Sequence, residues 1–319
     1  MDSMSRIPWI SHWRGGLLAC TLAGLASSSL AAEENQTRFV SPDLALTALR
    51  EAARAGDTNA MRALFGSALS DIANPDVVQR ANQMRSFARH LGEFSEIVTQ
   101  ANQSVVIRLG ETHWPFPIPL IITNGQWVFD TPAGKEEILN RRIGRNELSA
   151  MEVCHAYVQA QRDYAAKDRD GNGVMEYAPH FRSTPGTKDG LYWETVPGED
   201  PSPFGPLVAR AQEEGYYQSA PRDPAQPKGC TPFHGYIFRI LKQQGREAPG
   251  GKYDYVINGH MLAGFGLLAY PVEWGNSGVM TFIVNQQGKI YQKNLGEKTA
   301  RLAPRIDAYN PDNTWRAAE

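Results

Sequence analysis

The sequence predicts an α+β fold in two units, and two observations lead to this prediction. In residues 38–132, apolar residues first recur every three or four positions, as on one face of a helix, and later every second position, as on a strand. Residues 133–319 open with one long helical pattern and end in a second set of alternating patterns. Because strands follow strands in each unit, we expect antiparallel sheets packed against helices.

Three helices are expected at the start of the first unit. Residues 41–43, Ser-Pro-Asp, provide an N-cap, a proline at the first helical position and an acidic first turn. Further helices are expected over residues 57–66 and 76–91, and Gly92 is the expected C-terminal stop of the third.

The rest of the first unit has the pattern of a small curved sheet. Asn124-Gly125 predicts a two-residue hairpin turn. Alternate prolines in residues 113–119 remove every second amide hydrogen, so this segment should lie at a sheet edge. The expected strands cover residues 94–100, 104–109, 118–123 and 126–130.

The second unit is predicted to pack one long helix on an antiparallel meander. Residues 133–167 are helical in pattern, with a kink or break expected at Gly144. Residues 179–232 hold ten of the 21 prolines, which indicates a long irregular excursion with one short helix over residues 206–214. The expected strands cover residues 236–241, 253–257, 262–270, 279–284 and 289–293.

Composition and charge narrow the classes of function. The chain has 32 Lys and Arg against 34 Asp and Glu, a formal charge of −2, so it lacks the basic excess of a nucleic-acid-binding protein. Its 42% hydrophobic content is that of a folded protein. We therefore expect a folded protein without a nucleic-acid partner.

The N-terminus has the layout of a secretory signal peptide. Arg6 and Arg14 precede an apolar stretch over residues 15–30, which ends in small residues suited to cleavage. Residues 1–31 are therefore the expected leader, and the mature protein is expected in the periplasm or outside the cell, without a transmembrane segment.

The three cysteines leave two questions open. Cys20 ends a Leu-Leu-Ala-Cys sequence, which offers lipidation at Cys20 as an alternative to simple cleavage. After cleavage Cys154 and Cys230 remain, and an oxidising compartment would allow one disulfide between them. The alternative is two unpaired cysteines, with one buried on a helix face.

A calcium-type loop follows the long helix. A hard cation needs several oxygen ligands from alternate residues and a glycine where the chain turns sharply. A complete loop of this type has a bidentate Glu at position 12, but this sequence has Pro179 there. The alternative to a calcium site is a solvated, acidic segment at the end of the helix. The loop's candidate ligands and its glycine are Asp168, Asp170, Asn172, Gly173, Val174 and Glu176.

Motifs for covalent catalysis are missing from the sequence. Ser277 lies in Gly-Asn-Ser-Gly, which lacks the Gly-x-Ser-x-Gly elbow and is typical of a turn. His-Glu-x-x-His and paired Cys-x-x-Cys motifs are also missing. The candidates for a general acid/base set are His234, His260, Asp254 and Glu273, and separate surface histidines are the alternative.

Residues 135–147 alternate in charge. Glu137 and Arg141 form a favourable i,i+4 pair. Arg141, Arg142 and Arg145 either form an anion-binding patch or belong to a solvated connecting helix with internal ion pairs.

Four long runs resemble an exported bacterial family known as domain of unknown function 2950. The resemblance implies export and no known activity or catalytic residue. By the order of its elements, the first unit resembles a nuclear-transport-factor-2-like cone. The C-terminal unit resembles the globular part of type IV pilins and pseudopilins, without their long apolar N-terminal helix. The runs are residues 114–119, 129–147, 185–193 and 277–282.

These observations favour a non-catalytic binding or assembly module of the cell envelope, with an envelope protein or polymer as its partner. Two alternatives are a hydrolase acting on an envelope polymer and a pilin-like component of a secretion or surface assembly. No cofactor other than calcium is expected.

Overall fold

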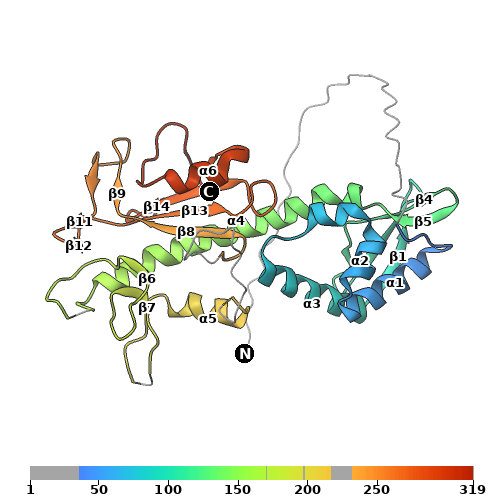
Figure 1. The fold of residues 1–319 in the computed structure, drawn as a ribbon, viewed down its shortest axis with the longest axis horizontal. Coiled ribbons are helices and arrows are strands. Elements are labelled where there is room, and N and C mark those ends of the chain that lie inside the picture. Colours follow the sequence, from blue (N-terminus) through green and yellow to red (C-terminus); the bar gives the residue numbers. More distant parts are fainter. Residues whose placement is uncertain (1–35, 170, 197, 217–231, 319) are drawn as a thin grey trace.

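The computed structural model describes residues 36–169, 171–196, 198–216 and 232–318. Two units lie at opposite ends of an elongated molecule, and the helix α4 runs between them along its length (Figure 1). The predicted leader and Cys20 lie outside the described residues. Among the described residues, no helix combines the length and the apolar character that a membrane crossing requires.

The first unit packs helices on an antiparallel sheet, as expected. The sheet has the order β1-β2-β4-β5, and β3 pairs only with the end of β2, so the proline-rich segment does lie at an edge. The elements are α1 (Pro42–Ala55), α2 (Thr58–Phe65), η1 (Ser67–Ile72), α3 (Val77–Glu93), β1 (Ser95–Thr99), β2 (Val105–Leu109), β3 (Trp114–Pro115), β4 (Leu120–Thr123) and β5 (Gln126–Phe129).

Helix caps explain where these helices begin. Ser41, Asp57 and Asp76 each accept hydrogen bonds from backbone N–H groups of the first turn of α1, α2 and α3. The predicted stop at Gly92 is wrong, because α3 continues to Glu93. The helix ends there since Phe94 takes an extended conformation and leads into β1.

Helix α4 (Thr131–Ala165) is shared by both units. Its first turn is fixed to the first unit, where Thr131 Oγ1 donates to the carbonyl of Phe65 at 2.8 Å. Its second half is buried in the core of the second unit. The predicted kink at Gly144 is wrong: α4 is one continuous helix. Gly144 is exposed and has no neighbour within 4 Å, so nothing opposes the helical conformation there.

The second unit contains a five-stranded antiparallel sheet in the order β16-β15-β14-β13-β8. Leu267 and Ala269 pack against α4, while the alternate residues Leu268 and Tyr270 pack against the C-terminal helical segment. The sheet is thus buried on both faces. Its strands are β8 (Tyr236–Leu241), β13 (Gly266–Pro271), β14 (Met280–Asn285), β15 (Tyr291–Asn294) and β16 (Arg316–Ala317), and the helical segment is η2 (Gly296–Lys298), α6 (Thr299–Leu302) and η3 (Ala303–Arg305).

Smaller elements complete the second unit and differ from the expectation. The excursion contains a parallel pair, although only antiparallel strands were expected. The single strand expected over residues 253–257 is two short ones, because its first part pairs with β9 and its second part pairs with β12. The elements are β6 (His180–Arg182), β7 (Gly190–Tyr192), α5 (Gly205–Glu213), β9 (Gln243–Gln244), β10 (Tyr253–Asp254), β11 (Val256–Ile257) and β12 (His260–Met261).

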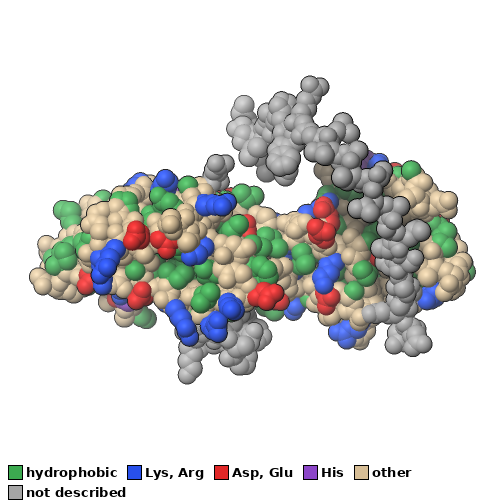
Figure 2. Space-filling view, turned by 90° about the horizontal axis from the view of Figure 1, so that it is seen from above, with side chains coloured by type: hydrophobic (Ala, Val, Ile, Leu, Met, Phe, Trp, Pro, Cys, Tyr) green, Lys and Arg blue, Asp and Glu red, His purple; other side chains and the backbone are tan. Residues whose placement is uncertain are grey.

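Charged side chains of both signs are interspersed over the face seen in Figure 2, and green apolar side chains lie between them. This mixture agrees with the near-zero net charge of the sequence.

Candidate ligand-binding cleft

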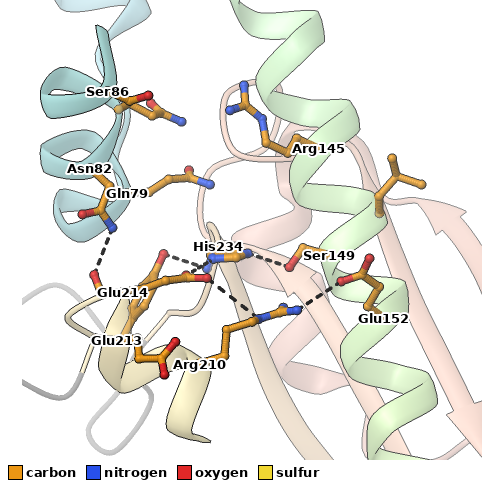
Figure 3. A pocket seen from close by; sticks show the side chains of 13 residues that line it. Gln79, Asn82, Ser86, Arg145, Ser149, Glu152, Arg210, Glu213, Glu214 and His234 are labelled. Carbon is orange, nitrogen blue, oxygen red and sulfur yellow. Dashed lines mark hydrogen bonds and ion pairs between the residues drawn. The ribbon is translucent and has the colours of Figure 1, made fainter. Parts of the chain in front are cut away.

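A cleft of about 730 Å³ separates α3 of the first unit from α4 and α5 of the second. Helix α3 lines it with amide and hydroxyl side chains, and α4 contributes Arg145, Ser149 and Glu152. Helix α5 and the residue after it add Arg210, Glu213 and Glu214, and His234 comes from the segment before β8 (Figure 3). The cleft therefore brings together residues that are far apart in the sequence.

His234 lies between a serine and a carboxylate. Its Nδ1 is 2.6 Å from Ser149 Oγ, and its Nε2 contacts Glu214 Oε2 (Figure 3). Glu214 also contacts Arg210, whose guanidinium forms a second ion pair, with Glu152, at 3.6 Å. Charge-assisted contacts of this kind orient the imidazole ring and determine which nitrogen carries a proton.

The backbone at His234 is strained, with φ at +48°. Residues other than glycine rarely take this conformation, and such strain persists only where the surroundings impose it. Here the His234 N–H donates to Tyr216 Oη at 3.1 Å, and the ring stacks on Phe233 with centroids 4.1 Å apart. The conformation aims the imidazole at Ser149 and Glu214.

Asp76 joins the two units behind the cleft. One carboxylate oxygen caps α3, and the other accepts hydrogen bonds from Tyr216 Oη at 2.7 Å and from Gly235 N at 3.1 Å. Burial, and then the negative charge of Asp76, raise the pKa of Tyr216 far above its ordinary value, so the phenol stays a donor. Asp76 thereby fixes the segment that carries His234.

A buried chain of amides runs beside Asp76. Asn74 Nδ2 donates to Gln79 Oε1 at 2.6 Å, Gln79 Nε2 donates to Asn146 Oδ1 at 2.8 Å, and Asn146 Nδ2 donates to the carbonyl of Ser277 at 2.8 Å. The Ser277 hydroxyl donates to the Glu273 carbonyl, which agrees with the interpretation of this serine as part of a turn. This network makes the floor of the cleft rigid.

The candidate patch of Arg141, Arg142 and Arg145 on α4 is not one patch in the structure. Arg141 pairs with Glu137 at 2.5 Å, as expected. Arg142 is buried and donates to main-chain oxygens of the first unit. Arg145 reaches from α4 toward α3 (Figure 3), and within the described ranges no hydrogen bond or ion pair engages it. Arg145 is one helical turn from Arg141 and Arg142, and it is close enough to repel Arg142, so the three side chains differ through their partners and not through their positions on the helix.

The four sequence candidates for acid/base chemistry lie apart. Of the four, only His234 lines the cleft. His260 Nδ1 contacts Glu176 Oε1 at 2.8 Å, Asp254 is exposed on β10, and Glu273 Oε2 accepts from the Asn276 amide at 3.2 Å. Ser149 and Glu214 were not candidates from the sequence, because they have no motif and lie 85 and 20 residues from His234.

The calcium-type loop is organised by its own hydrogen bonds. Asp168 accepts from the backbone N–H groups of Gly171, Asn172 and Gly173 at 2.8–3.2 Å. Asp170 lies outside the described residues. Among those that are described, no group of three or more His, Cys, Asp and Glu side chains is placed to hold a metal. The calcium site, including the carbonyl of Val174, stays a prediction.

Glu176 at the end of this loop fastens it to β12. Its carboxylate accepts from Met261 N at 3.0 Å and Asn172 Nδ2 at 3.0 Å, and contacts His260. Burial alone would raise the pKa of Glu176, but the hydrogen bonds, that from His260 first, outweigh burial and lower the pKa. Glu176 is therefore ionised at neutral pH, and its carboxylate holds the loop against β12 through these hydrogen bonds.

Cys154 is completely buried on α4, and burial raises the pKa of its thiol to about 12. This fits the expected buried cysteine on a helix face. Cys230 lies outside the described residues, so the disulfide between the two stays a prediction.

A family model described as a protein of unknown function, DUF2950, matches residues 36–318. No curated protein and no solved structure matches the chain, so the comparisons do not support the nuclear-transport-factor-2-like and pilin-like resemblances. The match extends over both units, α4 and the cleft between them. The chain belongs to the DUF2950 family.

Proposed function

We propose that this protein is an exported binding module that holds a charged, polar ligand from a cell-envelope polymer in the cleft between its two units. The observation that carries the proposal is the free guanidinium of Arg145 on α4, together with Glu152 further along the same helix and Glu213 and Glu214 at α5 on the other wall. The signal-peptide pattern of residues 1–31 supports export.

The charges of the cleft specify a class of ligand. A guanidinium binds a carboxylate through two parallel hydrogen bonds, so Arg145 would take an acidic group of the ligand. Glu213 is exposed and would accept hydrogen bonds from ammonium or hydroxyl groups. The amide and hydroxyl side chains of α3 suit further polar groups. A short peptide, free or attached to a glycan, presents all of these groups.

Replacing Arg145 with Ala tests the proposal. We expect the unmodified protein to bind a disaccharide-tetrapeptide fragment of peptidoglycan in isothermal titration calorimetry, and Arg145→Ala to bind it about tenfold more weakly or worse, the loss of one charge-assisted contact. Amidation of the peptide's carboxylates should weaken binding to the unmodified protein and leave Arg145→Ala almost unaffected.

Arg89→Ala is the matched control, because Arg89 is an exposed arginine on α3 whose partner is Glu93 at 3.7 Å, outside the cleft. It should bind as the unmodified protein does. The proposal fails if the fragment does not bind, or if Arg145→Ala and Arg89→Ala have equal affinities.

Ser149, His234 and Glu214 favour a second candidate function, hydrolysis of an ester or amide in the same cleft. In that reaction Ser149 Oγ would form a bond to the carbonyl carbon while its proton passes to His234 Nδ1. Glu214 would stabilise the imidazolium, which then gives the proton to the leaving group, and water would release the acyl group from Ser149. In the usual triad the serine contacts Nε2, whereas here it contacts Nδ1.

A fluorophosphonate probe distinguishes this second function from binding alone. If Ser149 is a nucleophile, mass spectrometry should find the probe on Ser149, and Ser149→Ala should lose both the label and any cleavage of the peptidoglycan fragment. Ser86→Ala, which changes another serine of the same cleft, is the control and should keep both. An unlabelled Ser149 together with an intact fragment would rule out the hydrolase.

A further inference from the structure

A second cavity, of about 720 Å³, lies inside the first unit, between α2, η1, α3 and the first half of α4. It lies on the other side of α3 from most of the polar cleft, and its lining is mainly apolar. The larger apolar side chains include Met61, Phe65, Ile72, Phe87, Phe116 and Ile118. The volume is in the range of pockets that enclose one small organic ligand.

The mouth of this cavity exposes apolar side chains to water. Val77 is 46% exposed and Met84 is 37% exposed, and both belong to α3 and line the cavity. Large apolar side chains that are exposed around a concave surface are typical of binding sites. The apolar interior and the apolar mouth together indicate a hydrocarbon ligand.

The charged groups of the cavity all have one sign. Its lining includes Arg62, Arg80 and Arg142, and no Asp or Glu among the described residues lines it. Arg62 and Arg80 are exposed, and Arg142 is buried. A lining that carries positive and no negative side chains favours an anionic ligand. The apolar part of such a ligand would fill the interior, and its anionic head would supply the negative charge that the lining lacks.

The lack of a negative charge in the lining is clearest at Arg142. Its guanidinium is buried, and its hydrogen bonds within the described chain go to the carbonyls of Ile72 and Ala73 and to Asn276 Oδ1, without a carboxylate. These three bonds use three of its five N–H donors. Burial first, and then repulsion from Arg145, lower the pKa of Arg142 to about 10 against a smaller opposing effect of the Glu273 carboxylate, so Arg142 is still charged at neutral pH. A buried cation without a directly bonded carboxylate is costly, and an anion at this position would reduce that cost.

We propose that the apolar cavity binds a single-chain amphiphile with an anionic head, its hydrocarbon chain against Phe65, Phe87 and Phe116 and its head at Arg62, Arg80 and Arg142. A free fatty acid and a lysophospholipid with an acidic head share this chemistry. The proposal does not depend on the polar cleft, which has a different lining.

Calorimetric titration of the purified protein with four probes tests this. We expect laurate, lauroyl-lysophosphatidylglycerol or both to bind saturably in a 1:1 ratio below their micelle concentrations, and the tighter of the two identifies the source of the ligand. Dodecyltrimethylammonium has the same chain length and the opposite charge, and it should bind at least about tenfold more weakly. Acetate, which has the head without the chain, should give no saturable binding.

Met84→Glu places a carboxylate at the mouth, and Met84 is exposed enough for the change to be tolerated by the fold. This variant should weaken binding of the anion about tenfold or more and strengthen binding of dodecyltrimethylammonium. Leu44→Glu is the control, because Leu44 is a 50% exposed apolar residue of α1 that does not line the cavity, and it should bind as the unmodified protein does.

Three results would overturn the proposal: neither anion binds in a 1:1 ratio, the cationic probe binds as tightly as the better anion, or Met84→Glu leaves the affinity for the anion unchanged. Circular dichroism of both variants, with equal melting temperatures for the two, separates these results from a loss of folding.

Discussion

Asp76→Ala is expected to lower the free energy of unfolding by about 3–8 kcal/mol, because it removes an N-cap worth about 1–2 kcal/mol and leaves two buried donors unpaired at about 1–3 kcal/mol each. The two donors are Tyr216 Oη and Gly235 N. Urea denaturation followed by circular dichroism measures the change. Because Asp76 joins the two units, the transition should also become broader, or split in two.

Asp57→Ala provides the matched control for this prediction. Asp57 caps α2 in the same way, because its carboxylate accepts hydrogen bonds from Asn59 N and Ala60 N. Within the described part of the chain, both of these hydrogen bonds are made to the first turn of α2 and neither reaches the second unit. Its replacement should cost about 1 kcal/mol, the ordinary value of an N-cap. If Asp76→Ala costs no more than Asp57→Ala, Asp76 does not join the units. Adding Tyr216→Phe to Asp76→Ala should recover part of the loss, since it removes one unpaired donor.

The same substitution at two glycines of α4 is expected to change stability in opposite directions. At Gly134 a new Cβ would lie 2.7 Å from Ile118 Cγ1 and 2.8 Å from the carbonyl of Pro117. Gly134→Ala should therefore lower the free energy of unfolding by about 1–3 kcal/mol through overpacking. Gly144→Ala meets no atom within 4 Å and should raise the free energy of unfolding by about 0.5–1 kcal/mol, the helix preference of Ala over Gly.

Urea midpoints of both variants, compared at equal slope, measure these effects. A stabilised Gly134→Ala would show that the segment around Ile118 moves aside at little cost. A destabilised Gly144→Ala would show that α4 is bent or broken at Gly144, contrary to the structure.

The elements that sequence patterns predicted best are those whose signals are local. The N-cap at Ser41, the starts of the next two helices, the Asn124-Gly125 turn and the apolar stripe of α4 all concern neighbouring residues, and each was found where expected. Glycine residues predicted helix ends and breaks less well. Gly92 and Gly144 both lie inside helices, because the backbone hydrogen bonds of a helix can continue through a glycine when nothing else favours a stop.

The cleft was much less predictable than the fold. His234 was a candidate from the sequence, but its contacts Ser149 and Glu214 come from α4 and from the residue after α5, with no motif to connect them. From the sequence, Arg141, Arg142 and Arg145 were either an anion-binding patch or part of a solvated helix with internal ion pairs, and in the structure each meets different neighbours. Their differences depend on which neighbour each meets, and no periodicity contains that information.

The α+β class, the order of the main helices and strands and the near-zero net charge all follow from the sequence taken alone. These follow from local propensity and composition, which act over a few residues. Only the tertiary structure decided that α3 faces α4 and α5 across a polar cleft, that Asp76 joins the two units, and that Arg142 is buried beside an apolar cavity. The reason is physical: these features depend on contacts between residues up to 159 positions apart, as for Asp76 and Gly235, and such contacts form only when the whole chain packs.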